Sequence, residues 1–261
     1  MKLVSVWLTN KCNYSCYYCP SKPYMHDTNF EFECQEKDRC PLCRSVDRTK
    51  ACESAVSRNR NGLLLPWLDK YLDPREWLVE LMGGEPGLYP EIGTLVPELE
   101  GRGYHGVIKT NGSLPIPYSG NFVRVAAWHK DRPFPKYYDV ILVIKNPEDD
   151  WAAKASHCKN MGIDYKTCVF NPEYRGESLP PGLHEDSKIT EYMYVNCFGQ
   201  ISPCPVRGVD KKKSIRDMDE PGTQKNMPAV CPKCVHTHSV ERFLSRELKD
   251  RIAGDYEEWR R

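Results

Sequence analysis

The chain has 261 residues, of which 40% are hydrophobic and 28% are charged, and its formal net charge is +1. This length suits one α/β domain with a small appendage, and the near-neutral charge gives no indication of a uniformly basic nucleic-acid-binding surface. No apolar run approaches the roughly 18 residues that span a bilayer, and the first residues enter a strand without signal-peptide features. We therefore expect a cytoplasmic protein with no membrane association.

Short apolar runs alternate with helix-like segments along most of the chain. The predicted strands are 3–8, 77–82, 106–109, 122–127, 140–144 and 165–170, and the clearest predicted helices are 90–100 and 150–161. Alternating strands and helices predict a parallel sheet with right-handed crossovers. The polar stretch 171–188, rich in Pro and Gly, indicates a linker and a domain boundary.

The first predicted strand is followed by a group of cysteines, Cys12, Cys16 and Cys19. A 4Fe–4S cluster has four irons, so three thiolates leave one iron open to another ligand. The alternatives are a structural zinc site or thiols that simply pack. A closed zinc site requires four ligands, and a three-cysteine loop fits it poorly.

Two further motifs follow predicted strands. Gly83-Gly84-Glu85-Pro86 comes directly after strand 77–82, and glycines at a strand end let the backbone approach a ligand closely. Thr110-Asn111-Gly112 follows the strand 106–109. Each motif alone is also typical of an ordinary tight turn.

Together, the segment LTNKCNYSCYYCP, the GGEP element and the TNG element resemble the radical S-adenosylmethionine (SAM) enzyme family. The resemblance implies a partial (β/α)6 TIM-like barrel over residues 1–170, with a cysteine-rich insertion at about 23–62. It implies that Cys12, Cys16 and Cys19 hold a 4Fe–4S cluster whose open iron is chelated by SAM. A reductant such as flavodoxin or ferredoxin would supply the electron that cleaves SAM to a 5′-deoxyadenosyl radical.

The resemblance also implies which residues line the cofactor. The backbone of the GGEP element and Glu85 would hold the amino group of SAM, and Asn111 would lie on the cofactor rim. His129 and Asn146 follow the fourth and fifth predicted strands, where a solvated strand end is an equal alternative. The complete predicted set is Tyr18, Gly83, Gly84, Glu85, Pro86, Asn111, His129 and Asn146.

The C-terminal part, residues 189–261, holds four more cysteines. Cys197 and Cys204 flank a predicted hairpin, and Cys231 and Cys234 form a CxxC pair before a helical tail. This spacing resembles the shortened auxiliary-cluster region called Twitch, and departs from the longer SPASM pattern. It implies a second 4Fe–4S cluster, with a structural zinc ribbon as the alternative.

The insertion carries its own cysteine group, Cys34, Cys40, Cys43 and Cys52. Its surroundings are polar, and a small segment with little core often requires a metal to hold it. Four ligands without an open position indicate a structural zinc, while another cluster or free thiols are the alternatives.

The predicted function is therefore that of a radical SAM enzyme that abstracts a hydrogen atom from its substrate. The substrate radical would then rearrange or be oxidised, with the auxiliary cluster assisting, so the enzyme is an isomerase or an oxidoreductase. Candidate substrates are a nucleoside or nucleic-acid base, as in viral isomerases of thymine adducts, a small molecule, or a peptide. A peptide is less expected because no recognition domain precedes the first strand. The non-enzymatic alternative is a zinc or Fe–S binding module.

Overall fold

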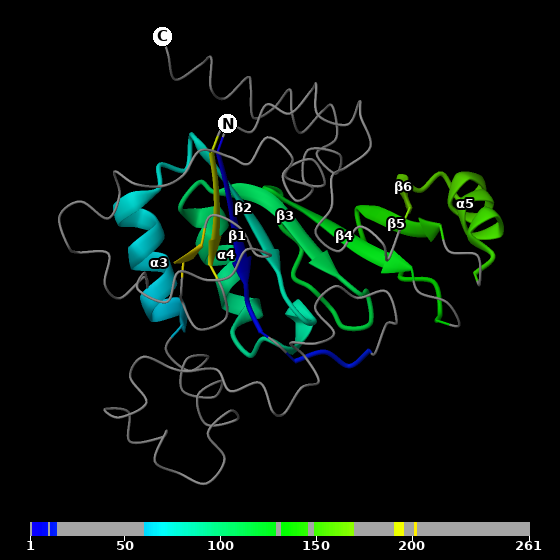
Figure 1. The fold of residues 1–261 in the computed structure, drawn as a ribbon, viewed down its shortest axis with the longest axis horizontal. Coiled ribbons are helices and arrows are strands. Elements are labelled where there is room, and N and C mark those ends of the chain that lie inside the picture. Colours follow the sequence, from blue (N-terminus) through cyan, green and yellow to red (C-terminus); the bar gives the residue numbers. More distant parts are fainter. Residues whose placement is uncertain are drawn as a thin grey trace, which may run out of the picture.

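One eight-stranded sheet organises the part of the chain that the computed structural model describes, which comprises residues 2–9, 11–14, 60–128, 132–145, 149–169, 191–195 and 201–202. Its strand order is β6-β5-β4-β3-β2-β1-β7-β8 (Figure 1). The strands are β1 (Lys2–Trp7), β2 (Trp77–Met82), β3 (His105–Thr110), β4 (Phe122–Trp128), β5 (Val140–Lys145), β6 (Tyr165–Val169), β7 (Glu191–Val195) and β8 (Ile201–Ser202). The described helices are α3 (Arg60–Tyr71), α4 (Ile92–Gly101), α5 (Trp151–Asn160) and the short 3-10 helix η1 (Pro86–Leu88).

The predicted α/β fold is confirmed. Strands β1 to β6 follow one another in order across the sheet, all pairs being parallel. The predicted strands and the helices α4 and α5 are found within about two residues of their expected bounds. The sheet is not closed, because β6 and β8 are its two edges. It is therefore an open sheet with the strand order of a partial barrel.

The predicted C-terminal hairpin is present as the antiparallel pair β7 and β8, and β7 connects it to the other strands of the sheet. β7 pairs with β1 in parallel, with Leu3 opposite Tyr192 and Val6 opposite Val195. Four consecutive residues of β7, from Tyr192 to Val195, are buried. A run of this kind is typical of a parallel strand covered on both faces. The expected linker, residues 171–188, lies outside the described residues.

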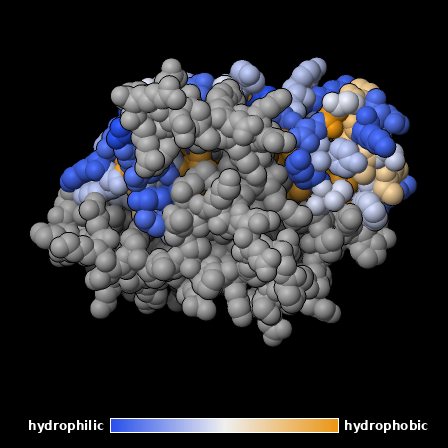
Figure 2. All heavy atoms as spheres, turned by 90° about the horizontal axis from the view of Figure 1, so that it is seen from above, coloured by the Kyte–Doolittle hydropathy of each residue, from blue (hydrophilic) through white to orange (hydrophobic). Residues whose placement is uncertain are grey.

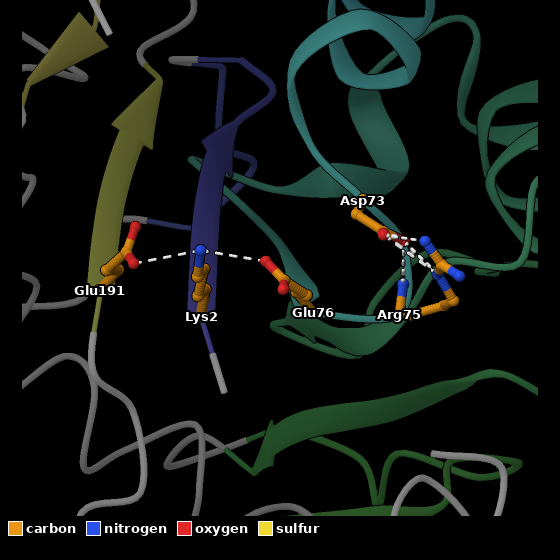
Figure 3. Close-up of polar contacts among 5 residues, drawn as sticks. All are labelled: Lys2, Asp73, Arg75, Glu76 and Glu191. Atoms are coloured by element: carbon orange, nitrogen blue, oxygen red, sulfur yellow. Dashed lines mark hydrogen bonds and ion pairs between the residues drawn. The ribbon is translucent and has the colours of Figure 1, made fainter. Parts of the chain in front are cut away.

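Ion pairs join the amino ends of β1 and β7. The Lys2 ammonium lies 3.0 Å from a carboxylate oxygen of Glu76 and 3.1 Å from one of Glu191 (Figure 3). Hydrogen bonds to Glu76 and Glu191 raise the pKa of Lys2. All three side chains are partly exposed, so each pair contributes at most about 1 kcal/mol. Asp73 and Arg75 form a second pair in the turn before β2 (Figure 3).

The two faces of the sheet differ in character. Val4 and Val6 of β1 belong to one apolar cluster with residues from α3, α4 and the neighbouring strands. The residues of the cluster that α3 and α4 contribute are Leu64, Leu65, Trp67, Leu68, Ile92, Leu95, Val96 and Leu99. Because successive side chains of a strand point to opposite faces, Ser5 lies on the other face. There it contacts Glu80 of β2, which is fully buried. The helices thus cover one face, and a polar group lies on the opposite one.

The described part of the surface in Figure 2 is mostly hydrophilic, with small apolar areas between the charged ones. Among the described helices, none combines the length and the apolar character needed to cross a membrane.

The contact between β2 and β3 requires a glycine, and this generates a prediction. A Cβ atom on Gly106 would lie 1.7 Å from the carbonyl oxygen of Val79, its partner in the register. We expect Gly106→Ala to push the strands apart and to lower the free energy of unfolding by about 1–3 kcal/mol or more. Gly93→Ala on α4 is the control, because a Cβ there meets nothing within 4 Å. It should raise stability by up to about 1 kcal/mol. Urea denaturation measures both, and equal effects would contradict the argument.

Candidate cofactor site at the ends of β1, β2 and β3

The carboxyl ends of β1, β2 and β3 meet at one edge of the sheet, because these strands are parallel. Beyond the ends of β1 and β2, the segments that follow the two strands stay joined by backbone hydrogen bonds. The Leu8 amide donates to the Met82 carbonyl at 2.7 Å, the Gly84 amide to Thr9 at 2.7 Å, and the Glu85 amide to Lys11 at 2.8 Å. The GGEP turn is therefore bonded to the segment that leads into the first cysteine group. The sequence places these two motifs about seventy residues apart.

At Gly83 the GGEP turn approaches the segment after β1 closely. Its φ is +146°, and a Cβ atom at this position would lie 2.7 Å from the carbonyl oxygen of Thr9. Any side chain would clash with the neighbouring backbone and strain its own. The glycine is thus required by the close approach of the Thr9 backbone, whereas the expected close approach of a ligand to this turn stays a prediction.

The Glu85 carboxylate lies between the ends of β2 and β3 and is fully buried. One oxygen accepts from the Gly87 amide at 2.9 Å and from the Thr110 hydroxyl at 2.6 Å, and the other accepts from the Asn111 amide at 2.7 Å. Burial raises the pKa of Glu85, and these three donors offset part of that rise. Its side chain thus binds the GGEP turn to the TNG turn. The expectation that Glu85 holds the amino group of SAM stays a prediction.

Cys12 is the first of the three predicted cluster ligands, and it lies beside both turns. Its sulfur accepts from the Tyr14 amide at 3.4 Å and from the side-chain amide of Asn111 at 3.8 Å. N–H donors around a thiolate are typical of iron–sulfur sites, where they stabilise the negative charge on sulfur. The surroundings of Cys12 therefore fit the predicted cluster. Cys16, Cys19 and Tyr18 lie outside the described residues.

A ring of three hydrogen bonds joins the cysteine segment to the TNG turn. Asn111 donates to the Asn13 side-chain oxygen at 2.9 Å, and Asn13 donates to the Ser113 hydroxyl at 2.8 Å. Ser113 closes the ring by donating to the side-chain oxygen of Asn111. Sequence reasoning identified Asn111 but missed Asn13 and Ser113. The only signal was that each is a polar residue within two positions of a motif.

The remaining predicted site residues have the following placement. Pro86 opens η1, whose first turn is capped by Glu85. Outside the described residues are His129, Asn146, Cys34, Cys40, Cys43, Cys52, Cys197, Cys204, Cys231 and Cys234. Within the described ranges, no three His, Cys, Asp or Glu side chains group as a metal site. The predicted zinc site and auxiliary cluster therefore remain predictions.

Two charged contacts near the site were not expected. The Arg132 guanidinium lies over the Tyr14 ring, 4.2 Å from its centroid, in a cation–π contact. Below the strand ends, on the face away from α3 and α4, the buried Glu80 carboxylate accepts from Ser5 and forms an ion pair with Lys109. Lys109 directly precedes Thr110 in β3, so its side chain points to the opposite face of the sheet from that of Thr110. A buried carboxylate requires partners of this kind.

Comparison with known proteins gives matches to solved structures alone. No family model matches the chain, and no curated protein matches it. Streptococcus suis SuiB bound to S-adenosylmethionine is similar at 16% identity and a TM-score of 0.46, over 78% of this chain and 60% of that one. SuiB bound to the precursor peptide SuiA is similar at 14% identity and a TM-score of 0.46, over 84% of this chain and 65% of that one. The chain thus spans less than two thirds of the length of SuiB.

The burial of Glu85 predicts a specific pH dependence. Its pKa in the folded protein is raised above the ordinary value of 4.5. The unfolded chain therefore loses this proton at lower pH than the folded protein does. The contribution of Glu85 to stability is full below about pH 4.5 and falls as the pH rises through the raised pKa.

We expect this decrease in stability with rising pH to disappear in Glu85→Gln, whose side chain does not titrate. Thr110→Val removes a donor that lowers the pKa, so the fall should extend to higher pH. The measurement is the free energy of unfolding in urea at intervals from pH 4 to pH 8. If Glu85→Gln and the wild type give parallel profiles, the burial argument is wrong.

Proposed function

We propose that this protein is a radical SAM enzyme in which Cys12, Cys16 and Cys19 hold a 4Fe–4S cluster. The observation that carries the proposal is the assembly of three motifs at one edge of a parallel sheet. Cys12, Glu85 and Asn111 are far apart in the sequence, yet backbone and side-chain hydrogen bonds join their segments. The carboxyl edge of a parallel sheet is also where α/β proteins bind their ligands.

When bound, the cluster and SAM would together supply a 5′-deoxyadenosyl radical, with one electron from a reductant such as flavodoxin or ferredoxin. The chain's own residues hold and shape the site. Cys12 provides a thiolate ligand with N–H donors already beside its sulfur. Glu85 holds the β2 and β3 ends together, so that the GGEP and TNG turns form one wall. Positioning and shielding the reactive radical is the part of the chemistry that the protein itself contributes.

Eight of the remaining ten cysteines serve two further metal sites in this proposal. Cys197, Cys204, Cys231 and Cys234 hold a second 4Fe–4S cluster, which assists oxidation or rearrangement of the substrate radical. Cys34, Cys40, Cys43 and Cys52 hold a structural zinc, about one per chain. Elemental analysis of anaerobically purified protein distinguishes the two metals, because iron and zinc are quantified separately.

The substrate belongs to one of three classes: a nucleoside or nucleic-acid base, a small molecule, or a peptide. The discriminating measurement is substrate-dependent formation of 5′-deoxyadenosine. A true substrate raises the rate of 5′-deoxyadenosine formation above the rate with SAM and reductant alone, because hydrogen abstraction consumes the radical that SAM cleavage produces. Mass spectrometry of the consumed substrate then separates isomerisation, which leaves the mass unchanged, from oxidation.

The first test is the triple substitution of Cys12, Cys16 and Cys19 by Ala. We expect it to abolish 5′-deoxyadenosine formation and to lower iron to the content of the remaining cluster. Cys158→Ala is the control, because Cys158 is buried on α5 within a separate apolar cluster. It should retain iron and activity. Undiminished 5′-deoxyadenosine in the triple variant would falsify the proposed function.

The second test concerns the auxiliary cluster. Cys231→Ala with Cys234→Ala should lower iron per chain while leaving SAM binding intact. Product formation should stop, and SAM cleavage without product should continue. Both quantities are measured on the same preparation. Unchanged iron together with wild-type product formation would replace this cluster by a zinc ribbon.

A further inference from the structure

We infer that the side-chain amide of Asn111 raises the reduction potential of the cluster on Cys12, and that Asn13 and Ser113 hold this amide in place. The inference rests on the proposed function. It makes Asn111, Asn13 and Ser113 positioning residues, since none of them ligates iron. Their effect is on the potential at which the cluster accepts an electron.

The first step is the contact itself. The Asn111 amide nitrogen lies 3.8 Å from the Cys12 sulfur, and the Tyr14 amide nitrogen lies 3.4 Å from it. N–H donors to ligand sulfur favour the reduced state of a cluster, because that state carries more negative charge. The Tyr14 contact is local to the cysteine segment, whereas Asn111 comes from a different strand. Asn111 is therefore the donor that the tertiary structure adds.

The second step is the orientation of the amide. An Asn side chain carries an oxygen that accepts and a nitrogen that donates, and the two are distinguished by their partners. The Asn111 oxygen accepts from the Ser113 backbone amide at 2.9 Å and from the Ser113 hydroxyl. Its nitrogen is thereby turned toward Asn13 and Cys12. A flipped amide would place an oxygen against the sulfur and would lose the bonds to the Ser113 backbone amide, to Asn13 and to Cys12.

The third step is the closure of the ring. Asn111, Asn13 and Ser113 each donate one hydrogen bond to the next member and accept one from the previous member. Rotation of any one side chain breaks two of the three bonds. The two asparagines lie 98 residues apart in the sequence, so the ring also fastens the cysteine segment to the TNG turn.

The fourth step is the support beneath the ring. The backbone amide of Asn111 donates to the buried Glu85 carboxylate at 2.7 Å. The amide of Gly112 donates to the Thr110 hydroxyl at 3.1 Å, and Gly112 adopts a φ of +73° that a side chain would strain. The backbone that carries the Asn111 amide is therefore fixed independently of the ring. Asn13→Ala should consequently weaken the orientation of the amide without removing the donor.

The experiment is a redox titration of the cluster, followed by the EPR signal that is absent from the Cys12, Cys16 and Cys19 triple variant. Asn111→Ala removes the donor, and Asn111→Asp replaces it by a negative charge of the same shape. We expect the midpoint potential to fall in the order wild type, Asn13→Ala, Asn111→Ala, Asn111→Asp. Iron content should stay at the wild-type value in Asn13→Ala and Asn111→Ala.

The control is Asn121→Ala, which lies before β4 and contacts neither Cys12 nor the ring in the described structure. It should leave the potential unchanged. A structural role alone would change stability or iron content without an ordered shift in potential. Equal potentials in the wild type, Asn13→Ala and Asn111→Ala would overturn the inference, as would an equal shift in Asn121→Ala.

The failure of the proposed function has a different signature. A wild-type protein purified without iron and without the EPR signal would remove the cluster altogether, whatever the variants do. If Asn111→Asp assembles no cluster, the comparison of Asn13→Ala with Asn111→Ala decides, because both retain a neutral site.

Discussion

The site depends on the buried carboxylate of Glu85. Three donors from η1 and the end of β3 converge on its two oxygens, and its own backbone amide is bonded to Lys11. A carboxylate without water is stable only when donors of this kind surround it. The ends of β1, β2 and β3 are consequently held in one arrangement. Cys12 and Asn111 lie within hydrogen-bonding distance because of it.

The sheet supports this arrangement, and its two faces differ in the residues that they bury. One face buries valines and leucines against α3 and α4, and this burial contributes hydrophobic stabilisation. The other face carries Ser5, Glu80 and Lys109 on three adjacent strands. Ion pairs of this kind rarely stabilise a fold more than apolar residues of the same size would. All three residues lie within two positions of the carboxyl ends of their strands.

The position of β7 shows how the C-terminal part is joined to the rest. It pairs with β1, the strand that leads into the cysteine segment, and Trp7 packs edge-on against Tyr194 at 6.2 Å between ring centroids. β8 pairs with β7 at the edge of the sheet, so β7 connects the hairpin to the other strands. In the proposed function, the region that holds the auxiliary cluster would be anchored beside the first cluster's strand.

Local patterns in the sequence determined the strands β1 to β6, the helices α4 and α5, and the three motifs, because apolar periodicity and turn glycines act over a few residues. Only the tertiary structure decided which contacts form between segments that are distant in the sequence. Helix α3 contains Pro66, which weakens its local signal, and it forms because it packs on the sheet. The placement of β7 beside β1, the Glu85 contacts and the ring through Asn13 likewise join residues distant in the chain. Such contacts produce no recognisable pattern in the sequence, because each depends on the strand order that brings its partners together.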